Sequence, residues 1–286
     1  MELRKTFKNK LFFHIFRGLL TSFGAVAEAL ALSILFDIRL TFDFIILVIC
    51  ISGIIYFYDF FRELKIPEAT TDGETKRKGK YSRYYALPLL LFILYIIIIS
   101  LYGSTPSIIF SIFLILVGVL YDPIFKRITK IIPAFKDFYV AFCWLLLPVF
   151  MIIYYQKDLS LLVVVTLIFV FSRDIVNAFY CDIKDISNDK NAQLKTYAVI
   201  NGASNTIYVL QWVSIFSVLL LTISTVIGIL PLLSVSLVIP VILTSLLMNY
   251  SQKIQKYSPF FVEIEYYFWY LSIILFGLIL KGQIGF

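Results

Sequence analysis

The sequence predicts an all-α, polytopic membrane protein that forms a single domain over residues 1–286. Its composition is the first reason. The chain is 60% hydrophobic and 15% charged, whereas an average soluble domain is roughly half apolar and about a quarter charged. The second reason is that the apolar residues lie in long blocks, a pattern typical of chains that cross a bilayer repeatedly. A soluble globular protein, a disordered chain and a secreted disulfide scaffold are therefore excluded.

Nine apolar spans account for these blocks. Most have about 17–25 residues, the length needed to cross a hydrocarbon core of about 30 Å. The first block contains Ala25-Val26-Ala27, as a signal peptide would, but it continues to Phe36 and is read as a retained helix. We expect two four-helix halves and a ninth helix, with spans at 12–34, 44–62, 85–103, 106–121, 137–155, 161–180, 203–228, 231–249 and 261–280.

The basic residues predict the orientation of these spans. Of the 25 Lys and Arg residues, 22 lie on one side of the predicted membrane; the three on the other side are Arg39, Lys157 and Lys281. The positive-inside rule then places the N-terminus in the cytoplasm and the C-terminus outside. An excess of basic residues on the cytoplasmic side also explains the net charge of +7. We therefore expect contact with membrane lipid and no nucleic-acid partner.

The few cysteine and histidine residues exclude several kinds of site. There are three cysteines, without a C-x-x-C pair, and one histidine, His14. No disulfide framework, zinc site or histidine-based triad is indicated.

The strongest local motif is the second of two acidic stretches, within residues 174–196. It contains Asp182, Asp185 and Asp189. If the sixth span continues through it as a helix, the three carboxylates share one helical face. Such a stripe is tolerable when a hard cation such as Mg²⁺ bridges it to a second anion. A solvated charged turn is the alternative interpretation.

The first acidic stretch, within residues 56–83, follows the second span. Asp59 and Glu63 are separated by four residues and so share one helical face. Two acidic stretches at one membrane face would suit two metal ions that hold one diphosphate. Alternatively, both residues lie at an ordinary solvated helix end.

Basic residues accompany both acidic stretches on the predicted cytoplasmic side. Cations there can neutralise a diphosphate leaving group directly, although the positive-inside rule explains most of them without any ligand. The candidates are Arg62, Lys76, Arg77, Lys126 and Lys195.

Taken together, these motifs resemble the UbiA superfamily of intramembrane prenyltransferases. Asp182, Asp185 and Asp189, followed by Lys195-Thr196, are similar to the family's D-x-x-D-x-x-x-D segment and its trailing basic-Thr pair. The segment from Tyr121 to Lys126 is similar to the family's Tyr-Ser-x-x-Leu-Lys stretch. Lys136-Asp137, running into Val140-Ala141 and Trp144, is similar to the start of its fifth helix, and Gly79-Lys80-Tyr81-Ser82 to the end of its first loop.

The first motif departs from the family pattern. The family usually carries N-D-x-x-D-x-x-x-D, whereas this chain has Tyr58 at the Asn position and Arg62 at that of the second Asp, with Glu63 adjacent. Asp72 is a further candidate carboxylate. The first metal site is therefore weakened or rearranged relative to the family.

The resemblance implies Mg²⁺-dependent transfer of an isoprenoid group from a polyprenyl diphosphate to a lipophilic acceptor, with release of diphosphate. Asp59, Asp185 and Asp189 would be catalytic, with Glu63 and Asp182 as further metal ligands. The diphosphate would contact Tyr121 and the basic candidates named above. The prenyl chain length, the acceptor and the oligomeric state do not follow from the sequence.

Two acidic residues lie inside predicted spans. A charge at the bilayer centre costs about 2.5–3.5 kcal/mol on insertion scales, so Glu28 and Asp174 are functional hypotheses. For Glu28, recognition of the acceptor and a structural hydrogen bond are equally open.

Other functions remain alternatives. Intramembrane acids also suit a transporter, and the altered first motif suits a non-catalytic prenyl-lipid-binding relative. Within the enzymes, a terpene cyclase and a polyprenyl-phosphate phosphoribosyltransferase remain.

Overall fold

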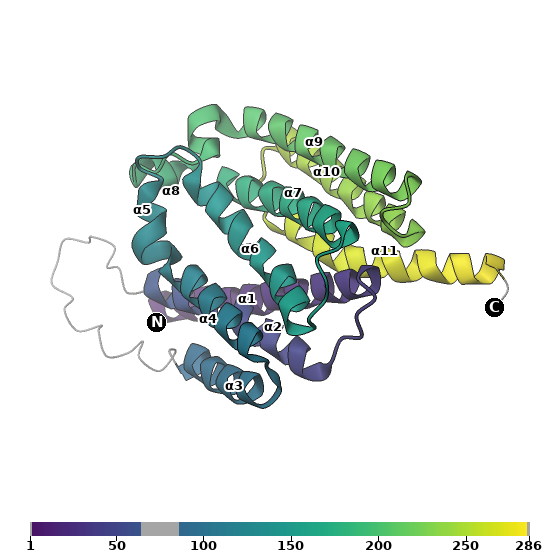
Figure 1. Cartoon of the computed structure of the whole chain (residues 1–286). Helices are drawn as coiled ribbons and strands as arrows, with labels where there is room; N and C mark the ends of the chain where they lie inside the picture. The colour runs from purple at the N-terminus through teal and green to yellow at the C-terminus, as the bar shows by residue number, and fades with distance from the viewer. Residues whose placement is uncertain (1, 64–85, 285–286) are drawn as a thin grey trace. The chain divides into compact units, whose positions relative to one another are not determined.

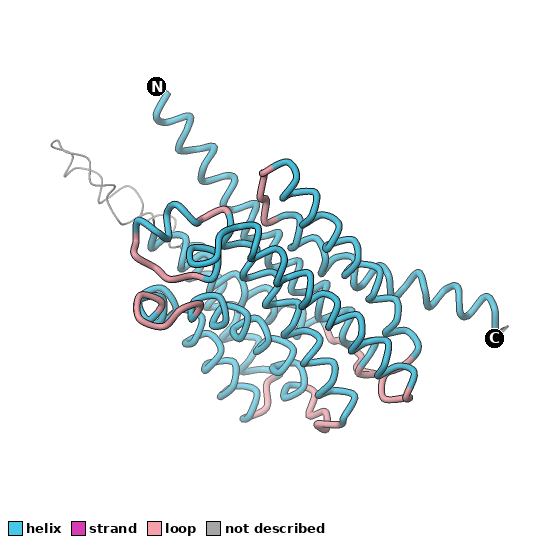
Figure 2. The backbone as a smooth tube through the Cα atoms, turned by 90° about the horizontal axis from the view of Figure 1, so that it is seen from above, coloured by secondary structure: helices cyan, strands magenta, loops and turns pink. Residues whose placement is uncertain are grey.

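The described part of the chain is helical. The structure, a computed structural model, describes the backbone of residues 2–63 and 86–284 and the side chains of residues 16–59 and 86–280. Within these ranges there are helices and connecting loops but no strand (Figure 2). The long helices are α1 (Glu2–Leu35), α2 (Phe42–Glu63), α3 (Ala86–Tyr102), α4 (Thr105–Leu120), α6 (Phe135–Tyr154), α7 (Leu161–Ile183), α9 (Tyr197–Val226), α10 (Val238–Ile254) and α11 (Phe260–Ile284).

Each predicted span overlaps one of these helices, in the same order along the chain. Among the described residues, eight helical segments are long and apolar enough to cross a membrane, and α3, with 17 residues, is a shorter apolar helix. The chain is thus an integral membrane protein with several spans. The count of nine transmembrane helices and the cytoplasmic N-terminus stay predictions.

Short elements join some of the long helices. A π-helical turn, η3 (Tyr121–Phe125), and α5 (Lys126–Ile128) follow α4. The helix α8 (Ile186–Asn191) lies between α7 and α9, and a 3-10 helix, η4 (Leu232–Leu237), precedes α10. The chain divides into two compact units, Met1–Val26 with Thr41–Val119, and Ala27–Leu40 with Leu120–Phe286.

In the first unit, small residues allow helices to approach closely. A Cβ atom at Gly118 of α4 would lie 2.5 Å from the side chain of Ile55 on α2, and one at Gly53 of α2 would lie 2.8 Å from Leu91 on α3. Close backbone approach through glycine is the usual way to pack helices within lipid, where the hydrophobic effect does not drive helices together. A hydrogen bond of 2.7 Å between the hydroxyls of Tyr95 and Ser111 links α3 to α4.

In the second unit, α7 packs against both α6 and α9. The helices α9 and α10 also pack together, and Figure 1 shows them side by side. A break in α9 at Gly202 (φ 76°, ψ 166°) uses a conformation that a residue with a side chain rarely adopts. The seventh predicted span begins at residue 203, directly after this break, because the apolar run starts there.

Candidate functional site

The second acidic stretch lies where α7 ends. One helix does not continue through it, so the condition for a shared helical face is not met: α7 ends at Ile183 and α8 begins at Ile186. The backbone at Asp185 has φ −99° and ψ 6°, outside the α-helical values. Asp, Ser and Asn, which dominate this segment, favour turns because their side chains compete for backbone hydrogen bonds. Asp182, Asp185 and Asp189 therefore stand on α7, on the junction and on α8, respectively.

Two of the three carboxylates nevertheless converge on one cation. The ammonium of Lys136, in the first turn of α6, lies 2.7 Å from Asp182 Oδ1 and 3.0 Å from Asp189 Oδ2. The three side chains are only 12%, 9% and 8% exposed, so the cluster is largely shielded from water. Asp185 is separate from this cluster: its side chain is 36% exposed and lies 3.5 Å from the ammonium of Lys184.

Burial raises the pKa of Asp189 above its ordinary value, while the ammonium of Lys136 opposes this shift. Burial and the neighbouring carboxylate of Asp182 disfavour the charged form of Asp189, whereas the ammonium favours it. A further positive charge at this point would favour the ionised form. The cluster therefore has the electrostatic character of a cation site.

The start of α9 is anchored beside this cluster. Asp137, which is 1% exposed, accepts a hydrogen bond of 3.0 Å from the backbone N–H of Tyr197. Thr196 is the N-cap of α9 and accepts from the N–H of Val199 at 3.3 Å. The Thr of the predicted basic-Thr pair thus has a structural function, because it satisfies an N–H group that the helix start leaves without a partner.

The predicted phosphate-binding Lys195 is exposed, and its backbone is fixed by two hydrogen bonds. Its N–H donates to the carbonyl of Thr129 at 3.0 Å, and its carbonyl accepts from Ala134 at 2.8 Å. These bonds tie the connection before α9 to the connection before α6. Lys195 is therefore held at the same end of this unit as the Lys136 cluster.

Tyr121 and Lys126 lie at the two ends of the turn after α4. The ammonium of Lys126 is 3.2 Å from Asp122, one helical turn earlier, and is 28% exposed. The ring of Tyr121 stacks on that of Tyr139 at 5.7 Å between centroids. Pro123 lies inside the π-helical turn, where its missing N–H interrupts the regular helix.

The first acidic stretch is only partly described. Asp59 lies on α2 and is half-buried. Arg62 and Glu63 belong to the last turn of α2, but their side chains lie outside the described side chains, and Lys76, Arg77 and Asp72 lie outside the described residues. The role of this stretch stays a prediction.

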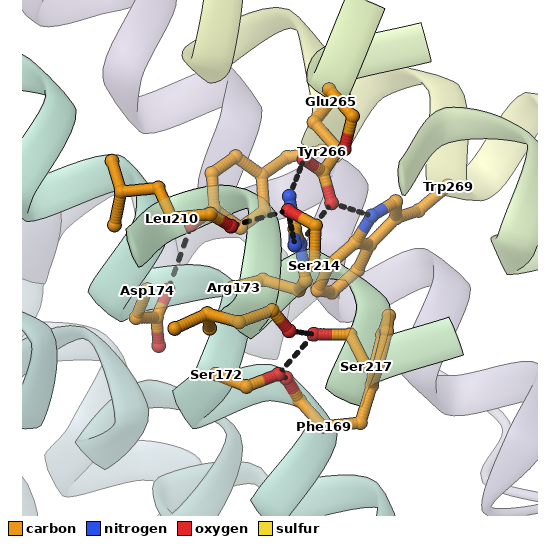
Figure 3. Close-up of polar contacts among 12 residues, drawn as sticks. Phe169, Ser172, Arg173, Asp174, Leu210, Ser214, Ser217, Glu265, Tyr266 and Trp269 are labelled. Atoms are coloured by element: carbon orange, nitrogen blue, oxygen red, sulfur yellow. Dashed lines mark hydrogen bonds and ion pairs between the residues drawn. The ribbon is translucent and has the colours of Figure 1, made fainter. Parts of the chain in front are cut away.

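A second polar cluster lies inside the second unit (Figure 3). The guanidinium of Arg173 on α7 makes two contacts of 2.7 Å with the carboxylate of Glu265 on α11 and a third, of 2.9 Å, with Ser214 on α9. The adjacent Asp174 accepts a hydrogen bond of 2.7 Å from the hydroxyl of Tyr266. Arg173 thus pairs with a residue 92 positions away and not with its neighbour Asp174.

Glu28, on α1, is also buried in the second unit, with 3% of its surface exposed. Among the residues that the structure describes, neither its Oε1 atom nor the Oδ2 atom of Asp174 has a hydrogen-bond partner. A buried oxygen without a partner is costly, so a structural hydrogen bond alone does not explain Glu28. Both interpretations of this residue stay hypotheses.

Among the side chains that the structure describes, no three His, Cys, Asp or Glu residues converge closely enough to hold a metal ion. Asp182 and Asp189 do converge, but on Lys136. Carboxylate oxygens are the ligands that Mg²⁺ prefers, and these two already face one cation. The carboxylate oxygens of Asp182 and Asp189 are therefore of the chemical type that binds Mg²⁺.

Sequence reasoning did not assign Lys136 to the site. The residue was part of a segment similar to the start of the family's fifth helix, and its place next to Asp137 was the available signal. Glu265 was also missed, although an acidic residue inside the ninth predicted span is itself unusual.

Comparison with known proteins decides the family. The sequence matches the model of the UbiA prenyltransferase family over residues 19–272. The chain belongs to this family. The resemblance drawn from the acidic motifs is thereby confirmed. No curated protein matches the chain.

Solved structures of UbiA homologues share the fold. One is a UbiA homologue from Archaeoglobus fulgidus bound to GPP and Mg²⁺, with a TM-score of 0.65, 13% sequence identity, and coverage of 93% of this chain and 98% of that one. The apo UbiA homologue from Aeropyrum pernix K1 has a TM-score of 0.56 and 14% identity, with coverage of 93% and 97%. A digeranylgeranylglyceryl phosphate synthase also has a TM-score of 0.56, with 15% identity and coverage of 93% and 98%.

Proposed function

We propose that this UbiA-family protein is a Mg²⁺-dependent intramembrane prenyltransferase. It transfers an isoprenoid group from a polyprenyl diphosphate to a lipophilic acceptor, aromatic or lipid, and releases diphosphate. Family membership supports the reaction class. Structural relatives bound to GPP with Mg²⁺ and to DMAPP with Mg²⁺ support the donor and the metal.

The observation that carries the proposal is the convergence of Asp182 and Asp189 on one ammonium where the membrane-spanning helix α7 ends. Two carboxylates that are less than a tenth exposed need a cation beside them. They are held by α7 and α8, and Lys136 comes from α6. The fold thus provides a preorganised anionic site next to apolar helices, as a charged head group with an apolar tail requires.

Asp182, Asp185 and Asp189 would hold the metal at this site. When bound, Mg²⁺ would neutralise the diphosphate and so make it a better leaving group. Lys126 and Lys195, both at least partly exposed, are cations that could contact the phosphate oxygens. On the first acidic stretch, Asp59, Glu63 and Arg62 stay candidates from the sequence for metal and phosphate binding.

The rest of the reaction depends on the surroundings of the isoprenoid. As the C–O bond of the allylic diphosphate breaks, the electron pair leaves with diphosphate, and the allylic carbon becomes open to attack by the acceptor. Apolar walls exclude water, which would otherwise capture this carbon. The acceptor's proton is lost as the new bond forms. The described helices supply apolar and aromatic side chains in abundance.

The test is a reaction with purified protein in detergent or liposomes. Prenyl diphosphates of ten to twenty carbons are supplied with Mg²⁺ and a panel of phenolic and glycerol-lipid acceptors, and products are identified by mass spectrometry. We expect an acceptor enlarged by one prenyl group and one diphosphate released per product, with both abolished by a chelator.

The same experiment separates the alternatives. A prenyl diphosphate that enters liposomes unchanged would indicate a transporter, and binding without diphosphate release would indicate a non-catalytic relative. Diphosphate release with a cyclised hydrocarbon product would indicate a terpene cyclase. Any of these outcomes would contradict the proposal.

A further inference from the structure

Lys136 lies between two carboxylates of the proposed metal site. Its ammonium contacts both buried carboxylates of the second acidic stretch, Asp182 at 2.7 Å and Asp189 at 3.0 Å. The three side chains come from three elements, α6, α7 and α8. The lysine is therefore a partner of two of the three carboxylates, Asp182 and Asp189, and not of Asp185.

The charge of the cluster explains why a cation is required there. Asp182 and Asp189 contact the same nitrogen, so without it two negative charges would face each other in a largely water-free environment. Asp137, the next residue along α6, is a further buried acidic side chain, 1% exposed. The ammonium of Lys136 thus supplies positive charge to both carboxylates.

An ammonium and a magnesium ion bind carboxylate oxygens at different distances. Magnesium–oxygen distances are about 2.0–2.1 Å, shorter than either ammonium contact, so both cations cannot occupy one point between the carboxylates. A metal ion bound to the same two oxygens would therefore displace the ammonium of Lys136 from at least one carboxylate. Its flexible stem of four carbons allows this movement without a change in the helices.

We propose that Lys136 is a built-in counter-ion that competes with Mg²⁺ for Asp182 and Asp189. It stabilises the metal-free site, and metal binding displaces its ammonium, which then becomes available to the phosphate of the donor. The inference rests on the proposed function in that the second acidic stretch is the metal site. Lys136 acts on the reaction through these carboxylates and is in this sense a positioning residue.

The first experiment measures binding of Mg²⁺ alone, without a prenyl donor. The melting temperature of the purified full-length protein is followed against Mg²⁺ concentration for wild type, Lys136→Met and Lys136→Arg. Because the competing charge is removed, we expect Lys136→Met to reach its half-maximal shift at about a tenfold lower Mg²⁺ concentration. Lys136→Arg keeps the charge and should remain close to wild type.

Lys184→Met is the matched control. Lys184 also pairs with an acidic residue of the stretch, Asp185, at 3.5 Å, but both side chains are about a third exposed. This variant loses the same charge without opening the buried pair, so its Mg²⁺ midpoint should stay near that of wild type. Equal midpoints for Lys136→Met and Lys184→Met would overturn the proposal.

A second measurement needs only the wild-type protein, in case Lys136→Met does not fold. The chain is treated with an amine-acylating reagent, with and without Mg²⁺, and the modification of each lysine is quantified by mass spectrometry. We expect Mg²⁺ to increase the labelling of Lys136 and to leave that of Lys157, in a distant loop of the same unit, unchanged. If Mg²⁺ protects Lys136 or has no effect on it, the ammonium is not displaced and the proposal is wrong.

These measurements are separate from prenyl transfer. A protein without transferase activity in which Mg²⁺ still displaces Lys136 would contradict the proposed function alone. If the protein is an active transferase but Mg²⁺ does not displace Lys136, only the proposed role of Lys136 is contradicted.

Discussion

The guanidinium of Arg173 and the carboxylate of Glu265 form a two-pronged ion pair, with both N–O distances at 2.7 Å. The pair joins α7 to α11, and a hydrogen bond from Arg173 to Ser214 adds α9. The indole N–H of Trp269 donates to the same carboxylate at 3.1 Å. Three helices that are distant in sequence are thus connected through one buried charge pair, in an environment where water cannot replace a lost partner.

We therefore predict that Arg173→Met strongly destabilises the protein. Removing one member of a buried pair leaves an uncompensated charge, at a cost of about 3–5 kcal/mol. The double variant Arg173→Met, Glu265→Gln should recover a large part of this loss, because no charge then remains unpaired. Thermal unfolding of the detergent-solubilised protein measures both effects.

Lys157→Met is the control for this prediction, since Lys157 is an exposed loop residue and its loss should leave the melting temperature nearly unchanged. A double variant as unstable as the sum of its single variants would mean that the pair does not couple the helices.

The positions of the helices could be predicted from the sequence because a bilayer demands long apolar stretches. All nine predicted spans overlap a helix in the same order. The boundaries were harder to predict where a helix continues beyond its apolar part. α9, for example, begins at Tyr197, before the break at Gly202, and η4 precedes α10.

The candidate site was only partly predictable. Carboxylates at Asp182, Asp185 and Asp189 have the same spacing whether one helix continues or two helices meet, so the spacing did not reveal the break at Asp185. The pairing of Lys136 with Asp189 joins residues 53 positions apart, and that of Arg173 with Glu265 spans 92. Such contacts depend on helix packing, which periodicity within one helix does not encode.

The orientation of the chain gives a second prediction. With 22 of 25 basic residues on one side, a reporter fused after Phe286 should be extracytoplasmic, and reporters inserted after Lys157 and after Lys190 should lie on opposite sides of the membrane. A cytoplasmic reporter after Phe286 would contradict the nine-span topology.

A third prediction concerns Arg62, where the family carries a carboxylate. An arginine cannot bind Mg²⁺, but its guanidinium can contact phosphate through two hydrogen bonds. We expect Arg62→Ala to raise the KM for the prenyl diphosphate or lower kcat by about tenfold, as for the loss of one charge-assisted contact of about 1.5–3 kcal/mol.

Arg62→Asp, which restores the family pattern, should instead change the Mg²⁺ concentration dependence. If both variants match wild type in donor kinetics and in Mg²⁺ titration, Arg62 is only an anchor at the membrane surface.

The last prediction separates metal binding from stability within the second acidic stretch. Asp189 is 8% exposed and pairs with Lys136, whereas Asp185 is 36% exposed and lies beside Lys184. Asp185→Ala should therefore remove activity and leave the melting temperature of the metal-free protein unchanged. Asp189→Ala should remove activity and also alter that temperature, because the ammonium of Lys136 loses a partner.

We expect each loss of activity to be about a hundredfold, as for other groups that stabilise a developing charge, and Asp59→Ala to be comparably severe. Asp158→Ala, in the exposed loop before α7, is the matched control and should retain full turnover. Turnover is measured as diphosphate release at saturating donor, with and without chelator. Should Asp185→Ala and Asp189→Ala both stay near wild type while the chelator still inhibits, the metal binds elsewhere, because neither carboxylate would then be its ligand.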